Sequence, residues 1–223
     1  MRTGRTVAVL LSIAILLVSF GERGAEAQAF QAEVGGGWAV PSSDVIMSRV
    51  MDGGGPRELD VDSRPHVYGA VGLVWTLSDN FALEGRIRAQ QMQLRGDAED
   101  FSGVEQCEGS CPDGYLRVAS VEGQITLTSV GRVNPYFLVG IGVARTTLDG
   151  TAAQTTRGEN VRFSDVDVTD AGGDVGFGAQ TRLVGGLQLT AEMRATGSLP
   201  GAKENAVTAF PFSLGVGYTF GAE

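Results

Sequence analysis

The sequence predicts an all-β fold: a closed, eight-stranded antiparallel up-and-down β-barrel behind a removable N-terminal segment. Segments that alternate apolar residues with polar or small ones recur along the chain, which is the side-chain period of a strand and not of a helix. Glycine occurs 33 times, often inside these segments, as is usual in strongly curved sheets. The connections alternate strictly between long and short along the chain, and the short ones have tight-turn compositions.

The first 27 residues have the three-part layout of a secretory signal peptide. Arg2 and Arg5 precede an apolar and small run from Thr6 to Phe20, and the polar stretch that follows ends in Ala25-Glu26-Ala27. The run has 15 residues, whereas a membrane-spanning helix needs about 20. We therefore predict cleavage after Ala27, at a site marked by Ala25 and Ala27, and a single domain over residues 28–223.

Eight strands are expected, and side-chain parity gives them one continuous apolar face. In the last strand the even-numbered residues from Phe210 to Phe220 are large and apolar, whereas the odd-numbered residues between them are small, polar or proline. The expected strands cover residues 30–41, 66–77, 81–95, 115–128, 135–148, 168–183, 187–198 and 206–220.

The connections between these strands are expected to lie at opposite ends of the barrel. The long ones cover residues 42–65, 96–114, 149–167 and 199–205, and the short ones cover 78–80, 129–134 and 184–186. Short periplasmic turns and longer extracellular loops are the layout of bacterial outer-membrane barrels. A soluble sandwich has no reason to keep this alternation.

The second face of the strands carries charge, which predicts that it faces a closed lumen. An eight-stranded barrel is too narrow for a water channel and is filled by side chains. Five acids and four arginines on this face nearly balance, as paired interior charges require. The alternative is a soluble sheet whose charges face bulk water. The predicted lumen network comprises Glu33, Glu84, Arg86, Arg88, Glu122, Asp174, Arg182, Glu192 and Arg194.

Aromatic residues occupy the two ends of the apolar face. Trp75, Phe81, Tyr218 and Phe220 lie near the short turns, and Trp38 lies near the long loops. Girdles of aromatic residues at both interfaces are typical of transmembrane barrels. The pattern therefore favours a transmembrane β-barrel.

The charge balance argues against a nucleic-acid partner. The chain has 17 basic and 26 acidic residues, and loss of three arginines and two glutamates with residues 1–27 leaves 14 and 24, a net charge near −10. The one lysine is Lys203. Proteins bind the phosphate backbone of nucleic acids through clusters of lysine and arginine, and the sequence contains no such cluster.

The two cysteines predict a small disulfide loop. Cys107 and Cys111 are separated by Glu-Gly-Ser within a polar loop of an exported chain, where disulfides persist. So short a ring stiffens the loop more than it stabilises the fold. Two thiols and scattered acids are too few for a metal site, so no metal and no cofactor are expected.

These features together resemble the transmembrane domain of outer membrane protein A and related small barrels, over residues 28–223. The most specific motif is the last strand, in which Ser213, Gly215, Tyr218 and Phe220 match the family's assembly signal. The resemblance implies recognition by the barrel-assembly machinery, residence in the outer membrane of a Gram-negative-type bacterium, and contact with outer-membrane lipid and lipopolysaccharide.

The leading function hypothesis is a monomeric, non-enzymatic barrel with a structural or surface-interaction role and long acidic extracellular loops. Its apolar belt would contact the lipid chains, and closure of the barrel would pair the backbone hydrogen-bonding groups of every strand. In this reading, replacing Arg86 or Arg182 by Leu lowers the unfolding temperature.

Three alternatives remain open from the sequence. A lipid-modifying enzyme would need a base, and His66 is the single histidine, in a position expected to be polar surface with no serine at a recognisable spacing. A narrow channel or a ligand-binding barrel could use the acids of residues 97–113 for divalent cations, although no ordered Ca²⁺-loop spacing is present. A soluble periplasmic lipid-binding barrel is the main alternative in architecture.

Overall fold

The computed structural model describes residues 29–41, 49–50, 64–95, 113–128, 132–150, 152–154, 160–162, 165–199 and 207–221. Eight long strands form a closed barrel. They are β1 (Ala29–Pro41), β3 (Arg64–Ser78), β4 (Phe81–Arg95), β5 (Asp113–Leu127), β6 (Val133–Leu148), β9 (Val166–Arg182), β10 (Leu187–Ser198) and β11 (Thr208–Phe220). No helix within these residues is long and apolar enough to cross a membrane.

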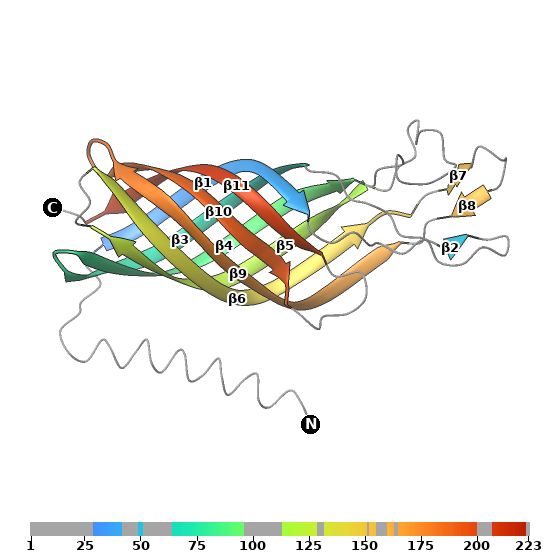
Figure 1. Ribbon diagram of the computed structural model, residues 1–223, viewed down its shortest axis with the longest axis horizontal. Coiled ribbons are helices and arrows are strands. Elements are labelled where there is room, and N and C mark those ends of the chain that lie inside the picture. The colour runs from blue at the N-terminus through green and yellow to red at the C-terminus, as the bar shows by residue number, and fades with distance from the viewer. Residues whose placement is uncertain are drawn as a thin grey trace, which may run out of the picture.

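The strands follow one another around the barrel in the order β1-β11-β10-β9-β6-β5-β4-β3, and every neighbouring pair is antiparallel. The register is strongly staggered. The chain of paired residues that begins at Gln31 of β1 and passes through Arg86, Asp174 and Ala209 returns to β1 at Pro41, ten residues further on. This stagger inclines the strands to the barrel axis, as Figure 1 shows.

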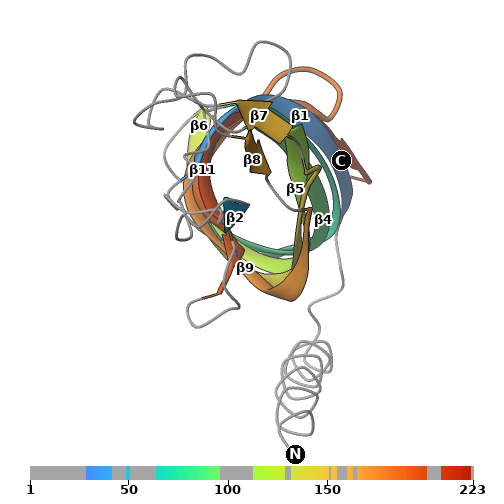
Figure 2. The same cartoon turned by 90° about the vertical axis from the view of Figure 1, so that its right-hand side faces the viewer.

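The barrel has a turn end and a loop end. The short turns lie at the end where β11 finishes, and the long connections leave from the other end (Figure 1). All eight barrel strands were predicted to within two residues of their observed limits. Three short strands were not predicted. They pair in the order β2 (Arg49–Val50), β8 (Asn160–Arg162) and β7 (Ala152–Gln154) and form a small sheet beyond the loop end (Figure 1). Viewed end-on, this sheet lies in front of the barrel mouth (Figure 2).

Side-chain parity sends large apolar residues outward and polar residues inward. In β5 the burial pattern alternates strictly, so Val121 and Ile125 are exposed whereas Glu122 and Gln124 are buried. β11 has the same regularity from Ala209 to Phe220. A soluble barrel has the opposite arrangement, with apolar residues inside. The alternative of a soluble lipid-binding barrel is therefore wrong.

Exposed aromatic residues mark both ends of the apolar belt. At the turn end, the Tyr218 ring lies edge-on to Phe220 with centroids 4.6 Å apart, and Phe81 is also exposed. Toward the loop end, Trp38 is exposed next to its β11 partner Phe212. These positions agree with the girdles predicted from the sequence.

Candidate functional site

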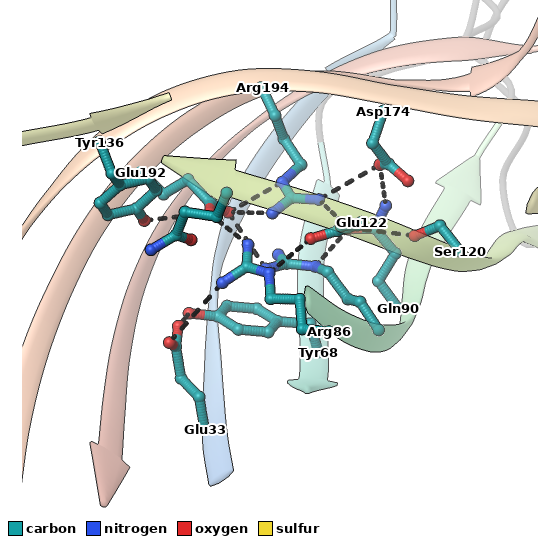
Figure 3. A network of polar contacts seen from close by, with 12 residues as sticks. Glu33, Tyr68, Arg86, Gln90, Ser120, Glu122, Tyr136, Asp174, Glu192 and Arg194 are labelled. Carbon is teal, nitrogen blue, oxygen red and sulfur yellow. Dashed lines mark hydrogen bonds and ion pairs between the residues drawn. The ribbon is translucent and has the colours of Figure 1, made fainter. Parts of the chain in front are cut away.

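The middle of the lumen holds a connected cluster of charged and phenolic side chains from seven strands (Figure 3). Each member lies on the inward parity of its strand. We call these residues the lumen cluster: Glu33, Tyr68, Arg86, Arg88, Glu122, Tyr136, Asp174, Glu192 and Arg194.

Arg86 joins carboxylates from three other strands. Its Nε donates to Glu122 Oε2 at 2.6 Å, and its Nη2 donates to Glu192 Oε2 at 3.1 Å. Glu33 Oε2 lies 4.0 Å from Arg86 Nη1. The side chains in these pairs are at most 2% exposed, so water screens the interactions little.

Arg194 extends the same cluster toward β9. Its Nη1 lies 2.7 Å from Glu122 Oε1 and 3.2 Å from Asp174 Oδ1, and its Nη2 lies 2.7 Å from Glu192 Oε1. Gln90 donates to Asp174 Oδ1 at 3.1 Å. Gly140 is the register partner of both Glu122 and Asp174, so no side chain lies between these two acids along the sheet.

The third arginine stacks on an aromatic ring. The guanidinium carbon of Arg88 lies 3.5 Å from the centroid of the Tyr68 ring, and Arg88 Nη1 lies 3.1 Å from Glu192 Oε1. The Tyr68 hydroxyl donates a hydrogen bond to Glu33, and Thr190 donates to the same oxygen at 2.9 Å. Phenol and hydroxyl donors thus supplement the arginines, which are outnumbered by acids.

The structure places eight of the nine predicted network residues in the buried lumen. Glu84 is buried on the same face of β4 as Arg86, two residues toward the turn end. Arg182 does not join them. Arg182 lies on the same face of β9 as the buried Gln180. It is nevertheless exposed, because it is the last residue of β9, where the lumen opens toward the turn. The inclusion of Arg182 was therefore wrong, because parity fixes the face of a residue and not its height in the barrel.

An apolar layer, which the sequence reasoning missed, closes the lumen on its loop side. Met92 and Leu94 of β4 and Leu116 and Val118 of β5 are at most 2% exposed and belong to one buried cluster. We call this cluster the apolar plug; its other members are Ala39, Ala144, Leu148, Val166, Val207 and Ala209. The lumen is therefore charged in its middle and apolar on the loop side of this charged region.

His66 was expected to be polar surface without a serine partner, and this was wrong. It is 2% exposed, and its Nε2 lies 2.8 Å from the Oγ of Ser213, which is fully buried. Both residues are register partners of Gly37 in β1, so they meet across a residue without a side chain. The pair resembles a nucleophile and base in composition, but a lipid ester outside the barrel has no direct contact with it.

Several predicted sites lie outside the described residues. These are the cleavage site at Ala25 and Ala27, the disulfide of Cys107 and Cys111, and most of the acidic loops. The residues of the expected assembly signal are described, in β11: Ser213 and Gly215 face the lumen, whereas Tyr218 and Phe220 face outward.

The sequence matches the family described as outer membrane protein beta-barrel domain over residues 10–220. The chain belongs to this family. It is an outer-membrane β-barrel protein of the Gram-negative type, as its apolar belt and charged lumen independently indicate. A search of curated protein sequences found no match.

Several solved structures are similar to this chain at low sequence identity. The attachment invasion locus protein Ail of Yersinia pestis, in complex with the heparin analogue sucrose octasulfate, is 15% identical with a TM-score of 0.44, covering 86% of this chain and 99% of that chain. Neisserial surface protein A is 14% identical with a TM-score of 0.45, covering 86% and 97%. OprG of Pseudomonas aeruginosa is 15% identical with a TM-score of 0.44, covering 89% and 99%.

Proposed function

We propose that this outer-membrane protein is a closed, non-conducting scaffold that has a structural or surface-interaction role and presents its long loops outside the cell. The observation that carries the proposal is the filled lumen. The cluster of Arg86, Arg194 and their carboxylates occupies the middle of the barrel with side chains at most 1% exposed. The apolar plug lies above it.

A channel is disfavoured on the same grounds. An ion crossing the lumen would have to break several ion pairs of Arg86 and Arg194, whose low-dielectric surroundings strengthen them. Planar-bilayer recording of the folded protein tests this directly. We expect no reproducible unitary conductance; events whose frequency scales with the amount of folded protein would contradict the proposal.

The surface role is tested by protease shaving of intact cells. We expect cleavage in the connections 42–63 and 96–112 and protection of the turn at 183–186, because the long connections leave from one end and the short turns from the other. Cleavage confined to the short turns would reverse the topology and remove the surface role.

An enzymatic role receives no support from the described residues. His66 and Ser213 are buried within the barrel, whereas outer-membrane lipids meet its outer wall. No group of three or more His, Cys, Asp or Glu side chains in the described part of the chain is placed to hold a metal ion. We propose that the His66–Ser213 hydrogen bond is structural.

The remaining expectations form part of the proposal. The barrel-assembly machinery would recognise β11 through Ser213, Gly215, Tyr218 and Phe220, and the folded protein would be a monomer in contact with lipid and lipopolysaccharide. A disulfide between Cys107 and Cys111 would close a small ring within the second long loop. Thiol alkylation before and after reduction tests the disulfide, since two alkylated cysteines without reduction would exclude it.

A further inference from the structure

Two grooves on the outer wall of the barrel meet between β3 and β4. The groove nearer the loop end has a volume of about 470 Å³ and includes Gly69, Ala89 and Ala119 among its lining residues. These three small residues are successive register partners on β3, β4 and β5. The wall dips along them because their neighbours Val67 and Val143 are larger.

The second groove continues the first toward the turn end. It has a volume of about 530 Å³, shares Gly69 and Ala89 with the first, and runs past Val71 and Ile87 to Tyr218. Val71 and Ile87 are exposed and apolar. The groove that they line can therefore accommodate an acyl chain. Both volumes lie within the range of small-molecule sites.

The loop-side mouth of the first groove is basic. Arg117 and Arg145 line it. Arg145 is neutralised by Asp167, whose Oδ2 lies 2.8 Å from Arg145 Nη2. Arg117 donates through Nε to the amide oxygen of Gln91 at 2.9 Å, and among the described residues no carboxylate pairs with it. The mouth therefore has one arginine whose charge is open to an anion.

The outward residues change from apolar to polar at this level. On β5 the outward positions are Val121 and Ala119 and then Arg117, and on β4 they are Ile87 and Ala89 and then Gln91. This change places Arg117 at the boundary between hydrocarbon and headgroups on the loop side. Lipid phosphates lie at that depth, and arginine binds phosphate through two parallel hydrogen bonds.

We propose that this groove binds a phosphate-bearing glycolipid of the outer leaflet, with a phosphate on Arg117 and one acyl chain lying over Gly69 and Ala89. Charge complementarity at the mouth selects an anionic lipid, and the apolar trench below it accepts the chain. The proposal rests on the proposed contact with lipopolysaccharide and deepens it, because it assigns that contact to one groove and one arginine. Planar-bilayer recording and protease shaving test the scaffold role separately.

The test uses the full-length folded protein in an uncharged detergent, titrated with bisphosphorylated lipid A and with the same lipid without phosphates. Native mass spectrometry measures the lipid-bound fraction. Arg117→Gln is expected to weaken binding of the phosphorylated lipid about fivefold, the effect of one basic residue near an anionic lipid surface. Ala89→Leu fills the trench without changing charge and is expected to weaken binding as well.

Two matched variants control for charge and for bulk. Arg132→Gln removes an exposed arginine at the turn end, and Ala191→Leu enlarges an exposed outward residue of β10. Both should bind lipid A like the wild type. Heat-modifiable gel mobility verifies folding of every variant. Ala89 and Arg117 are exposed on the outward parity of their strands, which is opposite to the lumen cluster.

Three outcomes would overturn the proposal. They are equal binding of the lipid without phosphates, unchanged binding by Arg117→Gln, and unchanged binding by Ala89→Leu. A dimer that Ala89→Leu dissociates, without lipid binding by the wild type, would assign the groove to a second copy of the chain and would also overturn it.

Discussion

Arg194 Nη1 lies 2.7 Å from Glu122 Oε1 and thereby joins β10 to β5 across the lumen. These strands are not neighbours in the sheet, because β9 and β6 lie between them. The ion pair therefore crosslinks the barrel through its interior, in addition to the hydrogen bonds that run around its wall. Arg86 does the same from β4, since it contacts Glu192 of β10 at 3.1 Å.

Replacing Arg86 by Leu is expected to lower the stability of the folded barrel by about 3–5 kcal/mol, because removal of one partner leaves buried charge uncompensated. Glu122 and Glu192 would both lose a donor. The unfolding temperature, followed by the heat-modifiable mobility of the refolded protein, measures the effect.

Arg182→Leu is the matched control for that prediction. Arg182 is exposed at the end of β9, so its replacement should leave the transition where it is. The sequence predicted a destabilising effect for Arg182→Leu as well, and the exposure of Arg182 removes the physical reason for it. Equal transitions for Arg86→Leu and the wild type would show that the lumen pairs contribute nothing to stability.

Parity within strands predicted the barrel, its lipid-facing side and most of the lumen charges. It did not predict the apolar plug, although the signal is present in β4. Inward residues change there from Arg88 and Gln90 to Met92 and Leu94, while the outward residues change from Ile87 and Ala89 to Gln91 and Gln93. The apolar and polar faces of β4 exchange sides because the strand leaves the membrane here. Its outer face then meets water, and its inner face forms an apolar core like that of a soluble protein.

Contacts that depend on stagger could not be predicted from single strands. His66 and Ser213 are 147 residues apart in sequence and meet because both pair with Gly37. The position of Arg182 outside the buried lumen likewise depends on how far each strand is shifted along its neighbour. The short strands β2, β7 and β8 lie within long connections whose composition indicated loops.

Leu116→Ala in the apolar plug is expected to cost about 2–5 kcal/mol, as cavity-forming substitutions of buried leucine do. Leu116 is completely buried between β4 and β6. Thermal unfolding of the refolded protein measures the loss.

Ile125→Ala tests the same strand on its other face. Ile125 is 50% exposed toward lipid, where acyl chains can occupy the space that the side chain leaves. We expect a clearly smaller loss of stability than for Leu116→Ala. If the two substitutions cost the same, the plug residues are not packed as a core.

Ser213→Ala is expected to lower stability by about 1–3 kcal/mol, because the buried Nε2 of His66 loses its hydrogen-bond partner. The hydroxyl should also be unreactive. Incubation of the folded protein with a fluorophosphonate, followed by mass spectrometry, is expected to show no adduct at Ser213. An adduct on that residue would revive the hydrolase alternative.

Gly215→Ala is expected to destabilise the barrel by about 1–3 kcal/mol, the usual cost of overpacking. A methyl group on Gly215 would lie 2.8 Å from Glu33 Oε1 and would collide with the hydroxyls of Tyr68 and Thr190, which both donate to that oxygen. Because Gly215 is also part of the expected assembly signal, refolding into detergent without assembly machinery isolates the packing effect. Gly123→Ala is the control, since a methyl group there meets no atom within 4 Å. Gly215→Ala protein that refolds and melts like Gly123→Ala would show that the glycine is not required for the contact between Glu33 and Tyr68.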